Sequence, residues 1–376
     1  MICSVYLFLF GVTAIKQIDD FVTATQTVHF ALIISGSILA MVTVAIKRKH
    51  FIIIVRTMSV KYFDYGDSFI IPEMEEEYKN TKKQRIIFLT VIPMYFAIST
   101  VVLGLGRTID GYFGSPLNET YVNDVYMLTP EPVWYPMKVD SDILYWFLAL
   151  SVVSMSYAAC ITVAGGDWIL FVLYLSITQQ FKILIYRMRR INAYAYRLHR
   201  KAGGVKLRKS MMFSNSSFLK YFNLCLSKHA EHHSIIIKQF EQLSIIMSWP
   251  AGFIFIFGSV IIAMSLLGVS VQGGGKPSIL VLATFLTFSE IGEMALFCGL
   301  SESIQTLGLS LHEELYRLNW ADADISAKRT IMIMIEQSKR PNVLKAAGLQ
   351  SLDWMAFSSI INTAYSYVNI LMAVDA

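Results

Sequence analysis

Long apolar stretches that contain no charged residue constrain this chain more than any other feature. Five such stretches occur: Phe21 to Ile46, Ile86 to Gly106, Ile143 to Gly166, Gln242 to Gly275, and Trp354 to Val374. A helix needs about 20 apolar residues to cross the hydrocarbon of a bilayer. Backbone groups in hydrocarbon must be hydrogen-bonded within the protein, which a helix achieves by itself. The chain is therefore predicted to be an all-α, polytopic membrane protein.

Two further stretches complete a set of seven predicted spans. Pro277 to Ser301 is apolar but carries Glu290 and Glu293, and Met1 to Ile15 is apolar but short. The N-terminal stretch has an alternative interpretation as a secretory signal peptide, since small residues occupy positions 12 and 14. A signal peptide normally begins with basic residues, which are absent here. We therefore favour a short first span.

The distribution of charge excludes other classes of protein and predicts an orientation. The 376 residues are 55% hydrophobic and 16% charged, whereas an average soluble domain is about 25% charged. Of the 32 basic residues, 28 lie in the connections 47–85, 182–238 and 304–350. Basic residues are retained on the cytoplasmic side, so the N-terminus is predicted inside and the C-terminus outside. Because the basic residues lie between spans rather than on one exposed face, no nucleic-acid partner is predicted.

The predicted outer connection, 107–141, contains the sequon Asn118-Glu119-Thr120. An asparagine in this sequence context can accept an N-linked glycan when it lies outside the cell. Asn118 is therefore a predicted glycosylation site.

The segment His229-Ala-Glu-His232-His233 has a histidine spacing that some di-iron membrane enzymes use. Such a centre needs about eight histidines in several boxes, and this chain has seven, the others being scattered. We expect this segment to form a polar face of a cytoplasmic helix. The sequence also lacks a recognisable catalytic triad motif. It predicts no metal site, no cofactor and no enzymatic activity.

Three acidic residues fall within predicted spans, where ionisable groups are costly and often functional. They are Asp167, Glu290 and Glu293, and the two glutamates share a helix face because they lie three residues apart. One interpretation is a transporter that uses Glu290 and Glu293. The other is a channel in which they join helices or line a vestibule, which we favour because the pair lies in the inner half of its span.

The last span carries a polar stripe. At about 100° per residue, Ser358, Asn362, Ser366 and Asn369 fall within a sector of about 80°. Two interpretations fit equally well: hydrogen bonds between helices, or the lining of an aqueous pore.

Several short motifs resemble those of insect odorant receptors, in the same order. They are Trp134-Tyr135-Pro136, Asp167, Glu314-Leu315-Tyr316, Trp320, Ser338-Lys339-Arg340-Pro341, Ala346-Ala347-Gly348 and Ala364-Tyr365-Ser366-Tyr367. The resemblance extends from about residue 17 over nearly the whole chain, and the family shares the inverted seven-span topology. The start of the family's first span has no counterpart here. The connection between the fourth and fifth spans is short, as in an odorant-specific tuning subunit rather than the shared co-receptor.

The resemblance implies a four-subunit, non-selective cation channel formed with the odorant receptor co-receptor in the plasma membrane of olfactory sensory neurons. The resemblance divides the chain into three parts. Residues 1–303 form spans one to six, with a ligand pocket in their outer half and with cytoplasmic helix extensions. Residues 304–350 form a cytoplasmic anchor, and residues 351–376 form a pore-lining C-terminal helix. The last helix is thus expected to be split into an anchor part and a pore part. By position, Ile370 matches the apolar gate, Val374 lies one turn outward, and Ala373 replaces a polar pore residue of the co-receptor.

The ligand that the resemblance implies is a small volatile molecule, which needs an enclosed apolar pocket with a few polar groups. Candidate residues lie on the second, third, fourth and sixth predicted spans. They are Thr25, His29, Ile33, Tyr95, Ser99, Thr100, Trp146, Leu150, Tyr157, Thr284 and Phe288.

Overall fold

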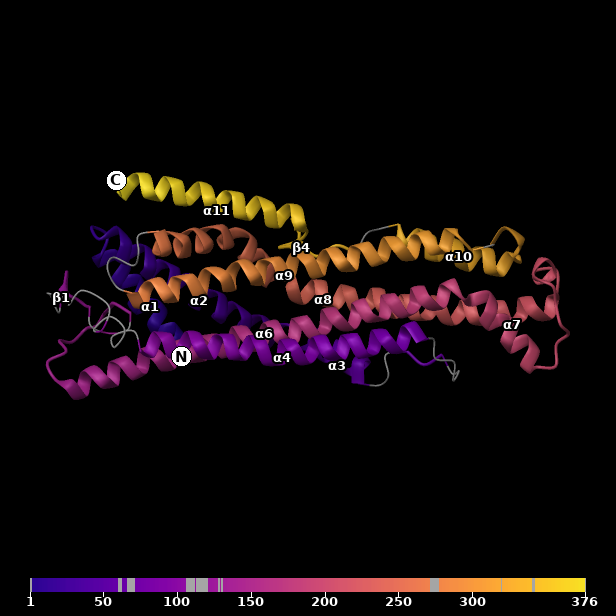
Figure 1. Ribbon diagram of the computed structural model, residues 1–376, viewed down its shortest axis with the longest axis horizontal. Helices are drawn as coiled ribbons and strands as arrows, with labels where there is room; N and C mark the ends of the chain where they lie inside the picture. Colours follow the sequence, from indigo (N-terminus) through magenta and orange to yellow (C-terminus); the bar gives the residue numbers. More distant parts are fainter. Residues whose placement is uncertain are drawn as a thin grey trace.

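The apolar stretches fold into long helices that lie side by side in an elongated bundle (Figure 1). The computed structural model describes residues 2–59, 63–65, 72–105, 112, 121–127, 129, 131–270, 277–318, 320–339 and 342–375. The main helices are α1 (Ile2–Lys16), α2 (Phe21–Ile46), α3 (Arg48–Ser59), α4 (Pro72–Gly104), α6 (Asp142–Arg189), α7 (Ile191–Lys201), α8 (Ser216–Ser270), α9 (Pro277–Tyr316), α10 (Ile325–Ser338) and α11 (Trp354–Asp375). Short 3-10 helices cover Lys209–Met211 and Trp320–Asp322.

The predicted spans coincide with α1, α2, α4, α6, α8, α9 and α11, in chain order. Among the described residues, four helices contain a segment long and apolar enough to cross a membrane: Thr23–Ile46, Asp142–Arg189, Ser216–Ser270 and Leu280–Tyr316. Helix α1 is apolar but shorter. The all-α, multi-pass architecture that the sequence predicts is confirmed. The glycine-rich end of the fifth predicted span, 271–275, lies outside the described residues, as does Asn118.

Several helices continue well past the predicted spans. Helix α6 runs to Arg189, α8 begins at Ser216, and α9 runs to Tyr316, so the expected boundary at 303/304 falls inside α9. These extensions, together with α7 and α10, form one end of the bundle (Figure 1). The C-terminus and the strand β1 lie at the opposite end, so the predicted outer connection and the chain end share a side.

Three short strands, which the sequence does not predict, form an antiparallel sheet in the connection before α6. They are β1 (Tyr121–Val122), β2 (Val125–Tyr126) and β3 (Val133–Trp134), in the order β1-β2-β3. Asn123 and Asp124 both have positive φ, 50° and 63°, as a two-residue hairpin turn requires. The sheet packs on α1, since the Trp134 N–H donates to Thr13 Oγ1 (2.8 Å) and Gln17 Nε2 donates to the Val122 carbonyl (2.7 Å).

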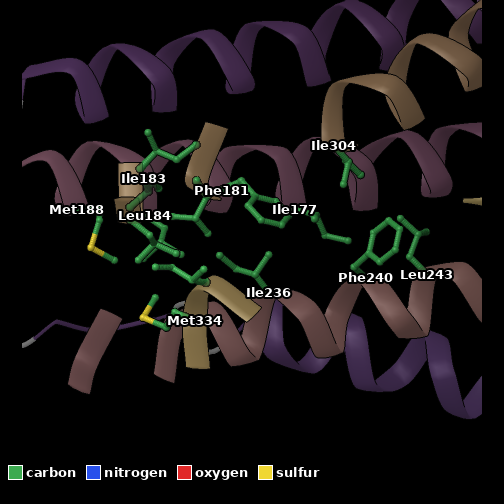
Figure 2. Packing of buried hydrophobic residues seen from close by; sticks show 14 of the residues in the cluster. Ile177, Phe181, Ile183, Leu184, Met188, Ile236, Phe240, Leu243, Ile304 and Met334 are labelled. Carbon is green, nitrogen blue, oxygen red and sulfur yellow. The ribbon is translucent and has the colours of Figure 1, made fainter. Parts of the chain in front are cut away.

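The largest hydrophobic core lies in the helix extensions. Figure 2 shows Ile177, Phe181, Leu184 and Met188 of α6 packed with residues of α8, α9 and α10. Phe181 and Leu184 have no exposed surface. Side chains outside the hydrocarbon are buried by the hydrophobic effect, so this end of the bundle folds as a water-soluble helical domain does.

A hairpin of two short strands separates α10 from α11. Strands β4 (Lys345–Ala346) and β5 (Gln350–Ser351) pair antiparallel. Ala347 (φ 49°) and Gly348 (φ 77°) form the turn, and the Ala347 N–H donates to the Ser248 carbonyl of α8 (3.0 Å). The Ala-Ala-Gly motif therefore anchors the start of α11 on α8.

Candidate functional site

A cavity of about 230 Å³ lies between α2, α4, α6, α8 and α9. Its wall is mainly aliphatic and aromatic. The lining side chains are those of Phe30, Ile33, Ile34, Gly36, Leu39, Ala40, Thr43, Val44, Phe51, Tyr95, Met155, Ser156, Ala159, Cys160, Val163, Gly166, Asp167, Ile169, Leu170, Ile246, Pro250, Phe253, Ile254, Ile261, Leu282, Leu286, Ser289, Glu290, Glu293 and Phe297. Pockets of about 300–1,000 Å³ suit drug-sized ligands, so this cavity suits a smaller, mostly apolar molecule.

All three intramembrane acidic residues line this cavity. Glu290 is held by two neighbours: its Oε1 lies 2.7 Å from His29 Nε2 of α2, and its Oε2 accepts a hydrogen bond from Ser265 Oγ of α8 (2.5 Å). Ser265 Oγ also lies 3.3 Å from His29 Nε2. Because these side chains come from three helices, the cluster fastens α9 to α2 and α8 beside the cavity.

The structure brings together only some of the predicted ligand residues. Ile33 and Tyr95 line the cavity, and the Tyr95 hydroxyl donates to the Phe285 carbonyl. His29 lies behind the wall through its contact with Glu290. Thr25 is buried on α2, and Thr284 Oγ1 donates to the Leu280 carbonyl of its own helix (2.8 Å).

Four other candidates do not line the cavity. The side chains of Trp146, Leu150, Tyr157 and Phe288 are each more than half exposed. On α6 the cavity is instead lined by residues such as Met155, Ala159, Cys160 and Val163, which occupy a different face. The side chains of Ser99 and Thr100 lie outside the described part of the chain.

Helix α8 contributes a wall that the sequence did not indicate. Ile246, Pro250, Phe253 and Ile254 line the cavity, although the ligand candidates were confined to four other spans. Pro250 was a usable signal, because proline within a helix removes a backbone hydrogen bond and bends the helix.

The C-terminal helix α11 has two different faces. Ala356, Ile360, Ala364 and Val368 are buried against α8 and α9, whereas Ser358, Asn362, Ser366 and Asn369 are exposed. A shallow groove along the polar face is lined by α11 residues alone: Met355, Ser358, Ser359, Asn362, Thr363 and Ser366. Figure 1 shows α11 along the outside of the bundle. The polar stripe therefore does not supply hydrogen bonds to the other helices that the structure describes.

The predicted gate residues continue this exposed face. Ile370 is 60% exposed, and Ala373 is also exposed. Val374 lies on α11, but its side chain is outside the described residues. At the other end of the helix, Gly299 of α9 permits close approach of the Trp354 ring, since a Cβ there would lie 2.9 Å from Trp354 Cζ2.

The sequence predicts that the histidines of 229–233 form a polar face of a cytoplasmic helix. In the structure all three are buried. His232 Nδ1 lies 2.6 Å from the Tyr65 hydroxyl, and its Nε2 lies 3.0 Å from Gln180 Oε1. Phe63 stacks on the imidazole, with ring centroids 4.9 Å apart. Both ring nitrogens of His232 thus have partners inside the protein, which is the condition under which a polar side chain can be buried.

Burial, helped by the charges of His229, Arg187 and His233, lowers the pKa of His232 from 6.5 to about 3. Burial also lowers the pKa of His233 from 6.5 to about 4. The two histidines therefore bind protons more readily in the unfolded chain than in the folded one. Their contribution to the free energy of unfolding is complete above pH 6.5 and is lost progressively as the pH falls below 6.5. At pH 5 we expect a loss of about 2 kcal/mol per histidine.

This pH dependence can be measured by thermal unfolding of the purified protein in detergent. Between pH 7.5 and pH 5 the melting temperature of the wild-type protein is expected to fall more steeply than that of a His232→Gln variant. Glutamine keeps a donor and an acceptor for Tyr65 and Gln180 without titrating. Equal slopes for the two proteins would show that His232 does not cause the dependence.

The long apolar helices define a multi-pass helical membrane protein. A model of the 7tm odorant receptor family matches residues 17–365. The chain therefore belongs to the odorant receptor family, as its motifs predict.

Two curated relatives and two solved structures agree with this assignment. Odorant receptor 85c of Drosophila melanogaster is 23% identical over 146 residues, which cover 39% of this chain and 37% of that protein. Odorant receptor 46a, isoform A, of the same species is 22% identical over 233 residues, which cover 62% of this chain and 54% of that protein. The matches thus span less than two thirds of either relative.

The solved structures establish the fold. The olfactory receptor OR5 of Machilis hrabei in complex with eugenol matches with a TM-score of 0.70 and 11% identity, over 99% of this chain and 88% of that chain. A second OR5 structure matches with a TM-score of 0.67 and 12% identity over the same shares.

Proposed function

We propose that this chain is an odorant-specific subunit of a ligand-gated, non-selective cation channel. It assembles with the odorant receptor co-receptor, in a tetramer, in the plasma membrane of olfactory sensory neurons. A small volatile molecule binds in the cavity between α2, α4, α6, α8 and α9, and the exposed face of α11 lines the pore. Membership of the odorant receptor family supports this function.

The observation that carries the pore assignment is the exposed polar face of α11. Hydroxyl and amide groups in hydrocarbon cost several kcal/mol when they lack a partner. Ser358, Asn362 and Asn369 face away from every described helix of this chain. Water in a pore shared with neighbouring subunits would hydrate these groups. The apolar gate is then Ile370, bordered by Ala373 and Val374.

Helix α9 supports a direct link between ligand and pore. Ser289, Glu293 and Phe297 line the cavity, whereas Met294 and Cys298, the neighbours of the last two, pack in the cluster that holds α11. A movement of α9 is therefore transmitted to both surfaces. Binding opens the pore only if the open state holds the ligand more tightly.

Whole-cell recording tests this function. Cells that express both the chain and the co-receptor are expected to show cation currents when volatiles are applied. Cells that express this chain alone are expected to show none, and cells with the co-receptor alone give the background. Saturable uptake of a solute without unitary currents would instead support the transporter alternative that uses Glu290 and Glu293.

A further inference from the structure

The polar side chains of the cavity are unusual in their charge. Asp167, Glu290 and Glu293 all line it, and none of its lining residues is a lysine, arginine or histidine. A carboxylate only accepts hydrogen bonds. The cavity therefore offers acidic side chains, and no basic one, to whatever occupies it.

Two of these three carboxyl groups lack a partner. Glu290 is bonded to His29 and Ser265, but no hydrogen bond or ion pair joins Asp167 or Glu293 to another residue in the described part of the chain. A carboxyl group without a partner in a low-dielectric interior costs several kcal/mol to ionise. A positively charged partner inside the cavity would offset that cost.

Two further groups in the residues of the cavity wall lack their usual hydrogen-bond partner. Thr43 is only 2% exposed and lines the cavity, yet its Oγ1 has no hydrogen-bond partner among the described residues. Ile246 and Pro250 also line the cavity. Because proline has no N–H, it cannot donate the usual helical bond to the Ile246 carbonyl. An N–H group is a suitable donor for a hydroxyl or carbonyl oxygen.

The surroundings favour an organic cation over a metal ion. Hard metal ions bind through several convergent oxygen atoms, and the described residues contain no group of three His, Cys, Asp or Glu side chains that could hold one. The remaining wall is largely aliphatic and aromatic. This combination matches a small molecule with one amino group and an apolar body.

We propose that the ligand of this cavity is a small volatile amine, whose nitrogen lies between Asp167 and Glu293 and whose hydrocarbon chain packs on α2 and α8. This inference rests on the proposed odorant-gated function. The bound pair is ammonium and carboxylate. It forms either when the ligand enters protonated, or when a neutral amine takes the proton of a protonated carboxyl group. The ammonium group then donates its N–H hydrogen bonds to the carboxylate oxygens.

Two probes of equal chain length test the proposal on the complete channel with its co-receptor. n-Hexylamine and 1-hexanol are applied to cells that express the wild-type chain, and half-maximal concentrations are compared. Hexylamine is expected to be at least about tenfold more potent, since hydrogen bonds to charged groups are the stronger kind. Asp167→Asn and Glu293→Gln are each expected to lower the ratio of the half-maximal concentrations of hexanol and hexylamine about tenfold.

Matched variants separate loss of binding from loss of folding. Asp167→Glu and Glu293→Asp keep the carboxyl group and are expected to keep the amine preference. Glu313→Gln, an exposed carboxylate on α9, is expected to change nothing. For any neutralised variant with reduced surface expression, the thermal shift of the purified complex on adding hexylamine measures binding directly, and it should be smaller than for wild type.

The possible outcomes distinguish this inference from the proposed function. Equal potency of the two probes, or full amine sensitivity in both neutralised variants, would overturn the amine assignment and leave the channel function standing. If a surface-expressed complex gave no current with either probe or with a wide panel of volatiles, the proposed function itself would fail.

Discussion

Replacement of Ile370 by serine is expected to raise the current that flows without any ligand several-fold. Ile370 is 60% exposed on α11, about 40° beyond the edge of the polar stripe. An apolar ring closes a narrow pore because water leaves it, and a hydroxyl ring holds water there. The measurement is basal whole-cell conductance in cells that express the Ile370→Ser chain with the co-receptor, normalised to surface expression.

Met372→Ser provides the matched control for this gate. Met372 is also exposed on α11, but it lies about 160° around the helix from Ile370, beyond the opposite edge of the polar stripe. It is expected to leave basal conductance unchanged. If Ile370→Ser also left it unchanged, Ile370 would not be part of the gate. If Met372→Ser opened the channel equally, the effect would reflect general damage to α11.

The second large effect is expected from Glu290→Ala, through stability. Glu290 and His29 are largely buried, with 14% and 5% of their side chains exposed. Removing one partner of a buried hydrogen-bonded pair leaves the other unsatisfied and costs about 1–3 kcal/mol. Surface biotinylation should therefore show a large loss of mature protein, and purified protein should melt at a lower temperature.

Three further variants make this prediction specific. Glu290→Gln retains an acceptor for Ser265 and should cost less than Glu290→Ala. Glu313→Ala removes an exposed carboxylate from the same helix, 3.6 Å from Arg317, and should cost little. In a His29→Ala background the additional cost of Glu290→Ala should shrink, because the two residues interact. A full, additive cost in that background would show that the contact with His29 contributes no stability.

The sequence predicted the helices well, because the features that define them are local. Uncharged stretches such as Ile143 to Gly166 determine a helix by themselves. The two faces of α11 also follow from helical periodicity, since its polar residues recur at positions 358, 362, 366 and 369. The pairing of Glu290 with His29 could not be predicted in this way, because the two residues are 261 positions apart.

The cavity was harder to predict for a physical reason. In a membrane, the lipid-facing and protein-facing sides of a helix are both apolar, so periodicity does not distinguish them. Trp146, Leu150 and Tyr157 lie on one face of α6, and that face is exposed rather than turned to the cavity. Burial of the histidines near 229–233 likewise depends on Tyr65 and Gln180, which are remote in sequence.

The position of α9 between the cavity and α11 has a consequence for how such receptors diversify. Substitutions on α2 or α6 at the cavity wall can change which molecule is preferred while leaving the contacts of α11 intact. Substitutions on α9 alter both surfaces at once, since Glu293 and Met294 are neighbours that face different ways. Shifts in odour preference should therefore accumulate first on α2 and α6, and changes on α9 should alter response strength together with preference.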